Sequence, residues 1–186
     1  DTVHFNFDSF AKGENSGISI NLVKEMENMT FTSITSSRDS DSLESQDIDF
    51  DSAMILNPNT TNVNLKAKSQ EFRLASKGNE KVNWLIGAYY YDEDLKNDSS
   101  VIFGPVWRTY ADVLTAGLTG GAATLDGVGA LIGLPGSQVF ATGQGTVGYF
   151  TQSTETTTFF GQVDINLTEQ MSAILGASYI EDEKQA

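Results

Sequence analysis

A short acidic stretch in the first third of the chain carries the side chains best suited to bind a metal ion. It contains Asp39, Asp41, Asp47, Asp49 and Asp51. Hard cations such as Ca²⁺ bind several carboxylate oxygens from a flexible loop. Counted from Asp39, the stretch lacks the glycine at the sixth position and the glutamate at the twelfth that an EF-hand loop needs. We therefore expect these residues either to bind Ca²⁺ or to form a solvated acidic loop, and we expect no other cofactor.

Trp107, Arg108 and Tyr110 form a second candidate site, for a ligand. Aromatic rings beside a guanidinium can stack on a sugar or on an aromatic chelate. The alternative is that they are boundary aromatics, which outer-membrane barrels carry at the membrane–water interface. The segment that follows holds ten glycines between Gly117 and Gly148 and a single charged residue. It predicts a mobile lid whose backbone groups can contact a ligand, with a linker as the alternative.

The composition excludes several classes of function. The 186 residues carry 25 Asp+Glu against 11 Lys+Arg, a formal net charge of −14, and such a surface repels nucleic acid. The absence of cysteine excludes disulfides, thiolate metal sites and a thiol nucleophile. With one histidine, His4, a catalytic triad is improbable, and the carboxylates lack a catalytic partner at a recognisable spacing. We expect no enzymatic activity and no nucleic-acid partner.

The elements that would position these side chains are β-strands, because apolar and polar residues alternate with a period of two along much of the chain. The strand segments are rich in threonine, isoleucine, valine, phenylalanine and tyrosine, which favour sheets. We predict an all-β protein with an antiparallel meander of about seven long strands. The predicted strands include the segments Val3–Phe7, Ile18–Leu22, Met29–Ser36, Ser69–Leu74, Val82–Tyr90, Phe159–Leu167 and Met171–Tyr179.

The predicted connections alternate between short turns and longer loops. Short turns are expected at residues 25–28, 76–80 and 168–170, and longer connections at 11–16, 39–64 and 92–149. A meander with short turns at one end and long loops at the other is the pattern of a transmembrane β-barrel with long extracellular loops. A soluble β-sandwich also shows alternating strands. Periodicity and loop length alone therefore leave both architectures open.

Three acidic clusters are predicted to follow every second strand, and together they hold about half of the acidic residues. If the short turns face the periplasm, these clusters all lie at the outer end of the meander. Because the clusters hold a large part of the acidic residues, the net charge would be concentrated on one rim. The clusters are Asp39–Asp51, Asp92–Asp98 and Glu181–Glu183.

Five sequence strings, in three groups along the chain, resemble the barrel strands of TonB-dependent receptors. MTFTSITSSR, Met29–Arg38, is similar to a common strand of that family, with Ser37 where an aromatic residue is usual. SQEFRLAS, Ser69–Ser76, and NWLIGAYYY, Asn83–Tyr91, resemble a second hairpin. FFGQVDINLT and LGASYIEDEK, from Phe159 to Lys184, resemble a third hairpin, in which a serine replaces the usual arginine. The strings occur in the order of the family.

The resemblance implies a segment of a ligand-gated outer-membrane transporter of about 22 strands. Such proteins have a plug inside the barrel and a motif that couples to an energy-supplying protein. We expect residues 1–186 to be a partial barrel with loops 39–64 and 92–149 and no plug domain. The implied partners are a nutrient (an iron chelate, cobalamin or an oligosaccharide), outer-membrane lipid, and the energy-coupling protein through parts outside this chain.

The competing hypothesis is a self-associating β-rich structural or interaction protein. Seven strands without closure leave two unpaired edges, which recruit other chains. This class includes a fibre-forming barrel fragment and a secreted β-sandwich. Under this hypothesis the protein is released or extracellular, whereas a transporter segment is expected in the bacterial outer membrane.

Overall fold

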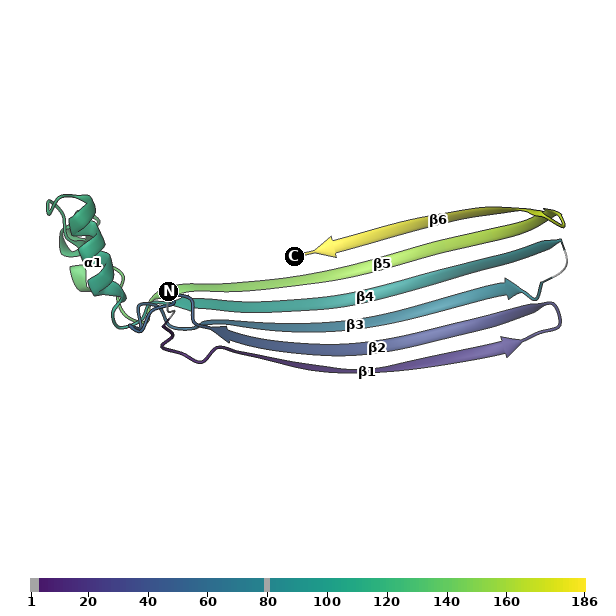
Figure 1. Ribbon diagram of the computed structural model, residues 1–186, viewed down its shortest axis with the longest axis horizontal. Coiled ribbons are helices and arrows are strands. Elements are labelled where there is room, and N and C mark those ends of the chain that lie inside the picture. The colour runs from purple at the N-terminus through teal and green to yellow at the C-terminus, as the bar shows by residue number, and fades with distance from the viewer. Residues whose placement is uncertain (1–3, 79–80) are drawn as a thin grey trace. The chain divides into compact units, whose positions relative to one another are not determined.

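The chain folds into one six-stranded antiparallel sheet whose strands lie in the order β1-β2-β3-β4-β5-β6 (Figure 1). The computed structural model describes residues 4–78 and 81–186. The all-β meander predicted from the sequence is confirmed, with six strands in place of about seven. The strands are β1 (Phe10–Glu25), β2 (Met29–Gln46), β3 (Asn59–Ser76), β4 (Val82–Ile102), β5 (Gly145–Thr168) and β6 (Met171–Gln185).

The register of the last hairpin shows why the alternating pattern produces a sheet with two different faces. Phe159 of β5 lies opposite Tyr179 of β6, and Val163 lies opposite Leu175. Because successive side chains of a strand point to opposite faces, residues of this parity share one face. The register shifts between Asn166 and Thr168, next to the turn.

The predicted alternation of connections is also present. Residues 26–28 join β1 to β2, residues 77–81 join β3 to β4, and residues 169–170 join β5 to β6, whereas residues 47–58 and 103–144 form long connections. Both long connections are shorter than the predicted loops 39–64 and 92–149. The reason is that β2 and β4 continue through their acidic residues to Gln46 and Ile102.

The prediction of a separate first strand and a connection at residues 11–16 was wrong. Residues 11–16 belong to β1, although glycine, asparagine and serine favour turns. Pairing with β2 overrides that local preference, and Gly17 permits the close approach, because a Cβ there would lie 2.9 Å from the carbonyl oxygen of Ser37. Phe5 and Phe7 precede β1 without forming a strand, and Val3 lies outside the described residues.

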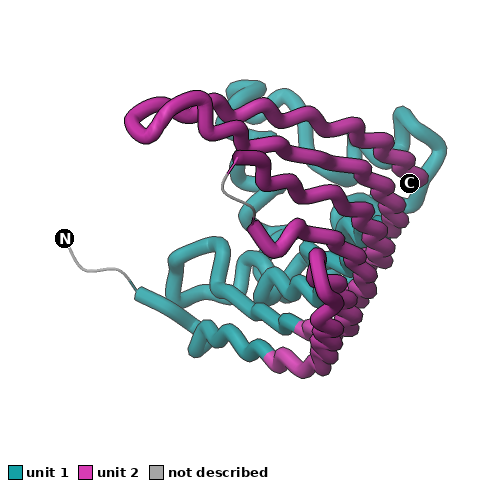
Figure 2. Tube along the Cα trace, turned by 90° about the vertical axis from the view of Figure 1, so that its right-hand side faces the viewer, with its two compact units in different colours: residues 1–13, 42–63, 97–150 teal, residues 14–41, 64–96, 151–186 magenta. Residues whose placement is uncertain are grey.

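The chain divides into two compact units, coloured separately in Figure 2. Unit 1 comprises the chain up to Gly13 with residues 42–63 and 97–150. It contains two helices, α1 (Trp107–Leu118) and α2 (Leu125–Leu131), and a short 3₁₀ helix, η1 (Gly136–Gln138). Within residues 4–78 and 81–186, the buried hydrophobic side chains are Ala111, Leu125 and Val139, all in the long connection of unit 1.

Unit 2 comprises residues 14–41, 64–96 and 151–186 and consists of strands and short turns. One face, here called the apolar face, carries Phe31 stacked on Phe72 at 6.1 Å, with Ile86 and Phe159 lining the same hollow. None of the described residues of unit 2 is a buried hydrophobic residue. The apolar side chains of this face are therefore half-buried or exposed, and none of those that the structure describes is fully buried.

The helices of the structure are confined to the long connection. Within the described parts of the chain, no helix is both long and apolar enough to cross a membrane.

Candidate functional site

The base of the connection between β4 and β5 is an aromatic cluster. Trp107 stacks on Phe103, with ring centroids 4.7 Å apart and an interplanar angle of 9°. Phe140, from the far end of the connection, packs edge-on against both rings. Such pairs stabilise a contact beyond the area they bury. The cluster therefore joins the two ends of the connection, and Trp107 contributes to its fold.

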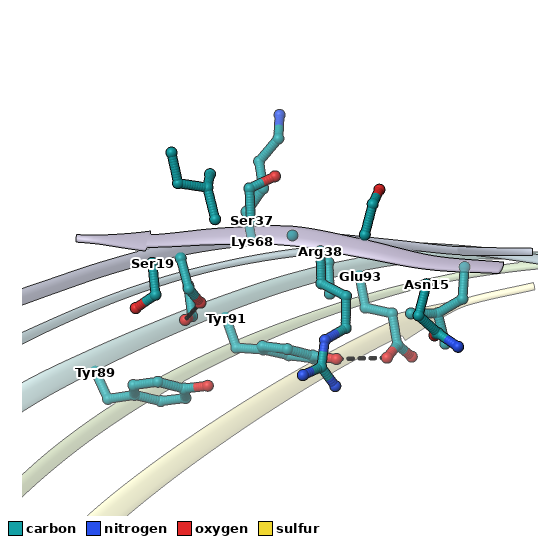
Figure 3. A pocket seen from close by; sticks show the side chains of 15 residues that line it. Asn15, Ser19, Ser37, Arg38, Lys68, Tyr89, Tyr91 and Glu93 are labelled. Carbon is teal, nitrogen blue, oxygen red and sulfur yellow. Dashed lines mark hydrogen bonds between the residues drawn. The ribbon is translucent and has the colours of Figure 1, made fainter.

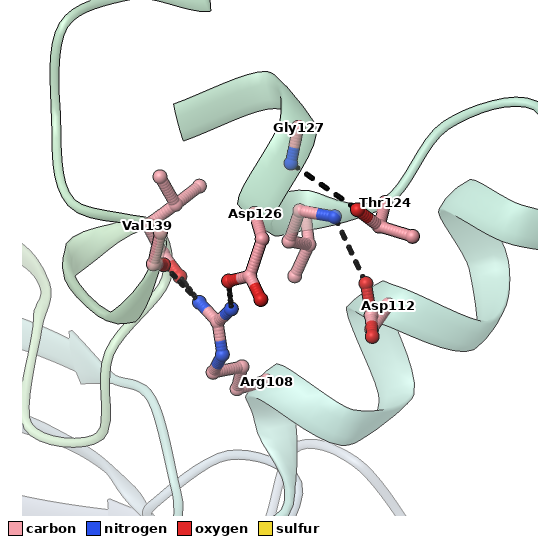
Figure 4. A network of polar contacts seen from close by, with 8 residues as sticks. Arg108, Asp112, Thr124, Asp126, Gly127 and Val139 are labelled. Carbon is pink, nitrogen blue, oxygen red and sulfur yellow. Dashed lines mark hydrogen bonds and ion pairs between the residues drawn. The ribbon is translucent and has the colours of Figure 1, made fainter. Parts of the chain in front are cut away.

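Arg108 fixes the helical part of the same connection (Figure 4). Its Nη1 donates to the carbonyl oxygens of Gly136 and Val139, the latter at 2.7 Å, and its Nη2 contacts Asp126 Oδ1 at 2.6 Å. The planar guanidinium suits several acceptors at once. The donors of Arg108 are thus used inside the connection, so the guanidinium is engaged before any ligand arrives.

One further contact places α2 against α1, and a second caps the start of α2. Asp112 Oδ1 accepts a hydrogen bond from the backbone N–H of Leu125 at 2.9 Å, and the hydroxyl of Thr124 accepts one from the N–H of Gly127 at 3.2 Å (Figure 4). A side-chain oxygen at a helix N-terminus satisfies donors that have no partner within the helix. The connection is therefore folded through its own hydrogen bonds, and its role as a mobile lid stays a prediction.

Two of the three residues predicted as a ligand site contact each other, because the Trp107 and Tyr110 ring centroids lie 5.9 Å apart with an interplanar angle of 43°. Trp107 also belongs to the aromatic cluster, the guanidinium of Arg108 bonds within the helical connection, and Tyr110 is 43% exposed. Apolar residues on and after the two helices are also exposed. They are Val113, Leu114, Leu118, Leu131, Ile132 and Leu134. A ligand at this connection would therefore meet Tyr110 and aliphatic side chains.

A second group of side chains lies on the other face of unit 2, here called the polar face. Figure 3 shows Tyr89, Tyr91, Arg38 and Glu93 on one side of the sheet and the side chain of Lys68 on the other. The Tyr91 hydroxyl donates a hydrogen bond to Glu93, and the Tyr89 and Tyr91 rings stack at 6.4 Å. The four residues line a hollow of about 970 Å³.

The polar-face hollow combines three kinds of recognition chemistry. The tyrosine rings offer flat surfaces, Arg38 offers a fork of donors for an anion, and Glu93 accepts hydrogen bonds. Across β2 and β3, the hydroxyls of Ser36 and Ser69 lie 2.6 Å apart. The hollow therefore suits a ligand that bears both rings and polar groups.

The sequence analysis did not single out this group. Tyr89 and Tyr91 share one parity along β4 and Tyr90 has the other, so the alternation already separates them. The partner Arg38 is on β2, which is two strands away in the sheet. No local pattern pairs residues across that separation, so the group becomes visible only in the fold.

The acidic residues predicted to bind Ca²⁺ lie at the end of β2 and in the connection that follows. Asp39 and Asp41 are on β2, where Asp39 contacts Lys66 at 3.8 Å and Asp41 accepts a hydrogen bond from Asn64. Among residues 4–78 and 81–186, no group of three or more acidic or histidine side chains is arranged to hold a metal ion. The calcium site therefore stays a prediction.

Asp47, Asp49 and Asp51 organise the connection between β2 and β3. Asp49 Oδ2 accepts from the N–H of Leu56 at 2.8 Å, and Asp51 Oδ1 accepts from the N–H of Ala53 at 2.9 Å. Such contacts are typical of acidic residues in turns. The three carboxylates thus have a structural role, whether or not they also bind an ion.

Asp47 is the most buried of these residues, at 5% exposure. Its Oδ2 accepts from the N–H of Asn6 at 3.0 Å, and its Oδ1 accepts from the N–H groups of Asp49 and Phe50 at 3.3 Å. Burial acts to raise the pKa of this carboxyl, but the hydrogen bonds to its charged form outweigh burial and lower the pKa below its usual value. Asp47 therefore joins the segment before β1 to this connection as a carboxylate.

The comparisons with known proteins give one structural likeness. No family model and no curated protein matches the sequence. The fold is similar to that of the ferric yersiniabactin uptake receptor FyuA from Yersinia pestis, with a TM-score of 0.60 and 11% sequence identity. The match covers 96% of this chain and 25% of that receptor, so the chain spans about a quarter of its length. At this identity the likeness concerns the fold alone.

Proposed function

We propose that this chain is a wall segment of a TonB-dependent, ligand-gated transporter that imports a scarce nutrient across the bacterial outer membrane. The observation that carries the proposal is the difference between the two faces of unit 2. Ile86 is 51% exposed, Phe159 56% and Leu175 67%, all on the apolar face. Tyr91, Arg38 and Glu93 lie on the polar face (Figure 3). A transmembrane barrel places one such face against lipid and the other toward a polar lumen.

Two further observations support this proposal. The strings that resemble TonB-dependent receptors coincide with strands, because Met29–Arg38 lies in β2 and Asn83–Tyr91 lies in β4. The string that begins at Phe159 runs along β5 and β6. The fold resembles that of an uptake receptor over nearly the whole chain. Each of these supports a transport function more than it supports catalysis.

The proposal places ligand recognition on the polar face and in the two long connections. The ligand would be an iron chelate, cobalamin or an oligosaccharide, and the energy-coupling protein would act through parts outside this chain. In unit 1, Tyr110 and the exposed aliphatic side chains of the helical connection would contact the ligand. Tyr89, Tyr91 and Arg38 would meet it in the lumen.

Membrane insertion can be tested with the two tryptophans of the chain, Trp84 and Trp107. Trp84 shares the parity of Ile86 on β4, whereas Trp107 lies in the helical connection. The single-tryptophan variants Trp107→Phe and Trp84→Phe are refolded into vesicles whose acyl chains carry bromine. We expect strong fluorescence quenching of Trp84 and little quenching of Trp107, because only the apolar face contacts hydrocarbon.

Each variant is a control for the other, since both have one tryptophan and receive the same vesicles. Acrylamide quenches from the aqueous phase, so it should quench Trp107 more strongly than Trp84. Equal quenching of both tryptophans by brominated lipid, or protection of Trp84 in a lipid-free soluble form, would contradict the proposal.

A second candidate function, self-association into a β-rich assembly, is supported by the edges of the sheet. The strands β1 and β6 each have one neighbouring strand in the sheet, and every residue of β1 is exposed. Unpaired edges recruit other chains. Sedimentation analysis in detergent-free buffer tests this function: polymers with a strand repeat of about 4.8 Å in fibre diffraction would support it, and a monodisperse monomer would exclude it.

A further inference from the structure

The helix α1 of unit 1 has one apolar face that is exposed. The residues of this face recur at the spacing of helical turns, so they form a single stripe along the helix. Val113 is 67% exposed and Leu118 is 87% exposed, and Leu114 and Gly117 are exposed as well. This face, here called the outer stripe, consists of Tyr110, Val113, Leu114, Gly117 and Leu118.

The opposite face of α1 is occupied by contacts within the helical connection. Ala111 is buried, and Asp112 Oδ1 accepts a hydrogen bond from the N–H of Leu125 at 2.9 Å. The guanidinium of Arg108 bonds to Asp126 and to two backbone carbonyl groups (Figure 4). The helix therefore packs on its own connection with one side and presents the outer stripe on the other.

The outer stripe is uncharged, although the chain as a whole is strongly acidic. The chain has a formal net charge of −14. The charged residues of the connection 103–144 are Arg108, Asp112 and Asp126, one positive and two negative, and all three make the contacts described above. Two copies of the chain repel each other wherever their acidic surfaces meet. An uncharged apolar surface is therefore where two copies can approach, whereas a charged partner would find no opposite charge there.

The outer stripe is also complementary to itself in shape. Two α1 helices can be placed antiparallel about a twofold axis that passes between Val113 and Leu114. Tyr110 of each copy then faces Gly117 of the other, and Val113 faces Leu114. A Cβ added at Gly117 would meet nothing within 4 Å, so the surface at this glycine has room for a ring. A large side chain thus lies opposite a small one on both sides of the axis.

We propose that the outer stripes of two copies of this chain pack against each other and join the copies into a homodimer. The contact is isologous, because the same residues of both copies form it. The antiparallel arrangement places the positive end of each helix dipole beside the negative end of the other. A ring packed over a glycine is a contact that the chain already makes within its sheet, between Phe160 and Gly87.

The dimer should be weak and should depend on protein concentration. The helix has 12 residues, which gives a length of about 18 Å. One helix pair of this length buries less surface than the roughly 800 Å² per partner of a standard interface. We therefore expect monomer and dimer to be in exchange.

The inference goes beyond the proposed function, since it requires neither membrane insertion nor a nutrient. It restricts ligand contact at Tyr110 to the single chain, because the second copy covers this ring. Leu131, Ile132 and Leu134 belong to α2 and the residues after it, and they are not part of the pairing.

Site-directed crosslinking tests the pairing, and the absence of native cysteine makes the reaction specific. The whole chain with Leu114→Cys is refolded in detergent micelles. It is treated with a bismaleimide whose span is about the 8–10 Å between the axes of packed helices. Residue 114 lies beside the proposed axis, so we expect a crosslinked dimer whose fraction rises with protein concentration. Ser137→Cys, at an exposed position of η1, is the control for copies that share a micelle by chance.

Two substitutions added to the Leu114→Cys chain test the contacts. Val113→Glu should reduce the crosslinked fraction about tenfold, because it buries a carboxylate without a partner. Gly117→Leu favours the helix and adds apolar surface, but it fills the space for Tyr110 and should reduce the fraction to a similar degree. The matched control Ser137→Glu adds the same charge outside the outer stripe and should leave the fraction unchanged. Circular dichroism confirms that each variant is folded.

The inference is overturned if Leu114→Cys and Ser137→Cys crosslink equally, or if Val113→Glu crosslinks as strongly as Ser137→Glu. Stronger crosslinking of Gly117→Leu would indicate general apolar association and would also overturn it. Sedimentation in density-matched micelles gives the size of the assembly. Dimers of the wild type that dissociate in Val113→Glu support the inference. Polymers that persist in this variant would assign association to the sheet edges and contradict the inference.

Discussion

The ring of Phe160 on β5 lies directly over Gly87 on β4. A Cβ built on Gly87 would be 2.3 Å from Cζ of Phe160 and less than 3.0 Å from two further ring atoms. On the opposite face, Gly161 leaves ordinary contact distance, with a Cβ 3.5 Å from Cγ2 of Ile86. The two strands are therefore locked together on one face by an aromatic ring that covers a glycine.

Gly87→Ala should destabilise the sheet because the added methyl group requires the ring of Phe160 to move. Overpacking of this kind costs about 1–3 kcal/mol in free energy of unfolding. The measurement is equilibrium unfolding by urea in detergent micelles. Gly161→Ala is the control and should cost much less. The cost of Gly87→Ala should also fall in a Phe160→Ala background, and an unchanged cost there would contradict the assigned contact.

Arg108→Ala should loosen the helical connection between β4 and β5. The substitution leaves the carbonyl groups of Gly136 and Val139 without their donor, and hydrogen bonds to a charged group contribute about 1.5–3 kcal/mol each. Limited proteolysis should show faster cleavage within residues 103–144, with the strands still protected. Arg108→Lys should restore only part of the protection, because an ammonium lacks the planar fork that reaches all three acceptors.

Asp126→Asn separates the ion pair from the carbonyl contacts. Its side chain is 76% exposed, and exposed ion pairs contribute about 0–1 kcal/mol. Cleavage should therefore increase much less than in Arg108→Ala. Equal effects of the two substitutions would show that Arg108 stabilises the connection through the ion pair and not through the backbone acceptors.

Asp47 should make the free energy of unfolding fall at acidic pH. Its pKa is lower in the folded chain than the usual value of 3.8. The stabilisation is therefore fully present above pH ~4 and is lost as the pH falls through the lower, folded value. Urea unfolding between pH 2 and pH 6 measures this dependence. Asp47→Asn should be less stable than the wild type at pH 6, and the difference should shrink below pH 4; a constant difference would contradict the argument.

If the acidic residues bind Ca²⁺, as the sequence predicts, Ca²⁺ should raise the free energy of unfolding. At a concentration one hundred times Kd, a single site would add about 2.7 kcal/mol. Thermal unfolding with CaCl₂ and with a chelator measures the effect, with MgCl₂ as the ionic-strength control. Asp49→Asn should reduce the shift. An equal response to both salts would show that the acidic residues act only through their hydrogen bonds.

The alternating pattern was sufficient to predict an antiparallel meander because side-chain parity is a local property of a strand. It also predicted the order of the long connections along the chain. The connections at residues 47–58 and 103–144 are, however, shorter than predicted. Strand ends were missed where polar residues continue the pairing, as at Gln46 and Ile102. A strand that extends beyond an apolar surface needs no apolar side chains, so its end leaves no signal in hydropathy.

The candidate sites depended more strongly on the fold. The sequence marked Arg108 as a ligand-binding residue because of its aromatic neighbours. Its acceptors, however, come from residues 136 and 139, about thirty positions away. The contact between Tyr91 and Glu93 lies within one strand and could have been found by parity. The position of Arg38 on the same face could not, because it depends on strand order.

The sequence by itself determined the period of two and the order of turns and long connections. These follow from the alternation of side chains along single strands. Only the tertiary structure decided that residues 11–16 pair with β2, that Arg108 bonds within the helical connection, and that Lys68 lies on the face opposite Tyr91. Each of these depends on which distant segment supplies the partner, and strand pairing across the sheet provides that information.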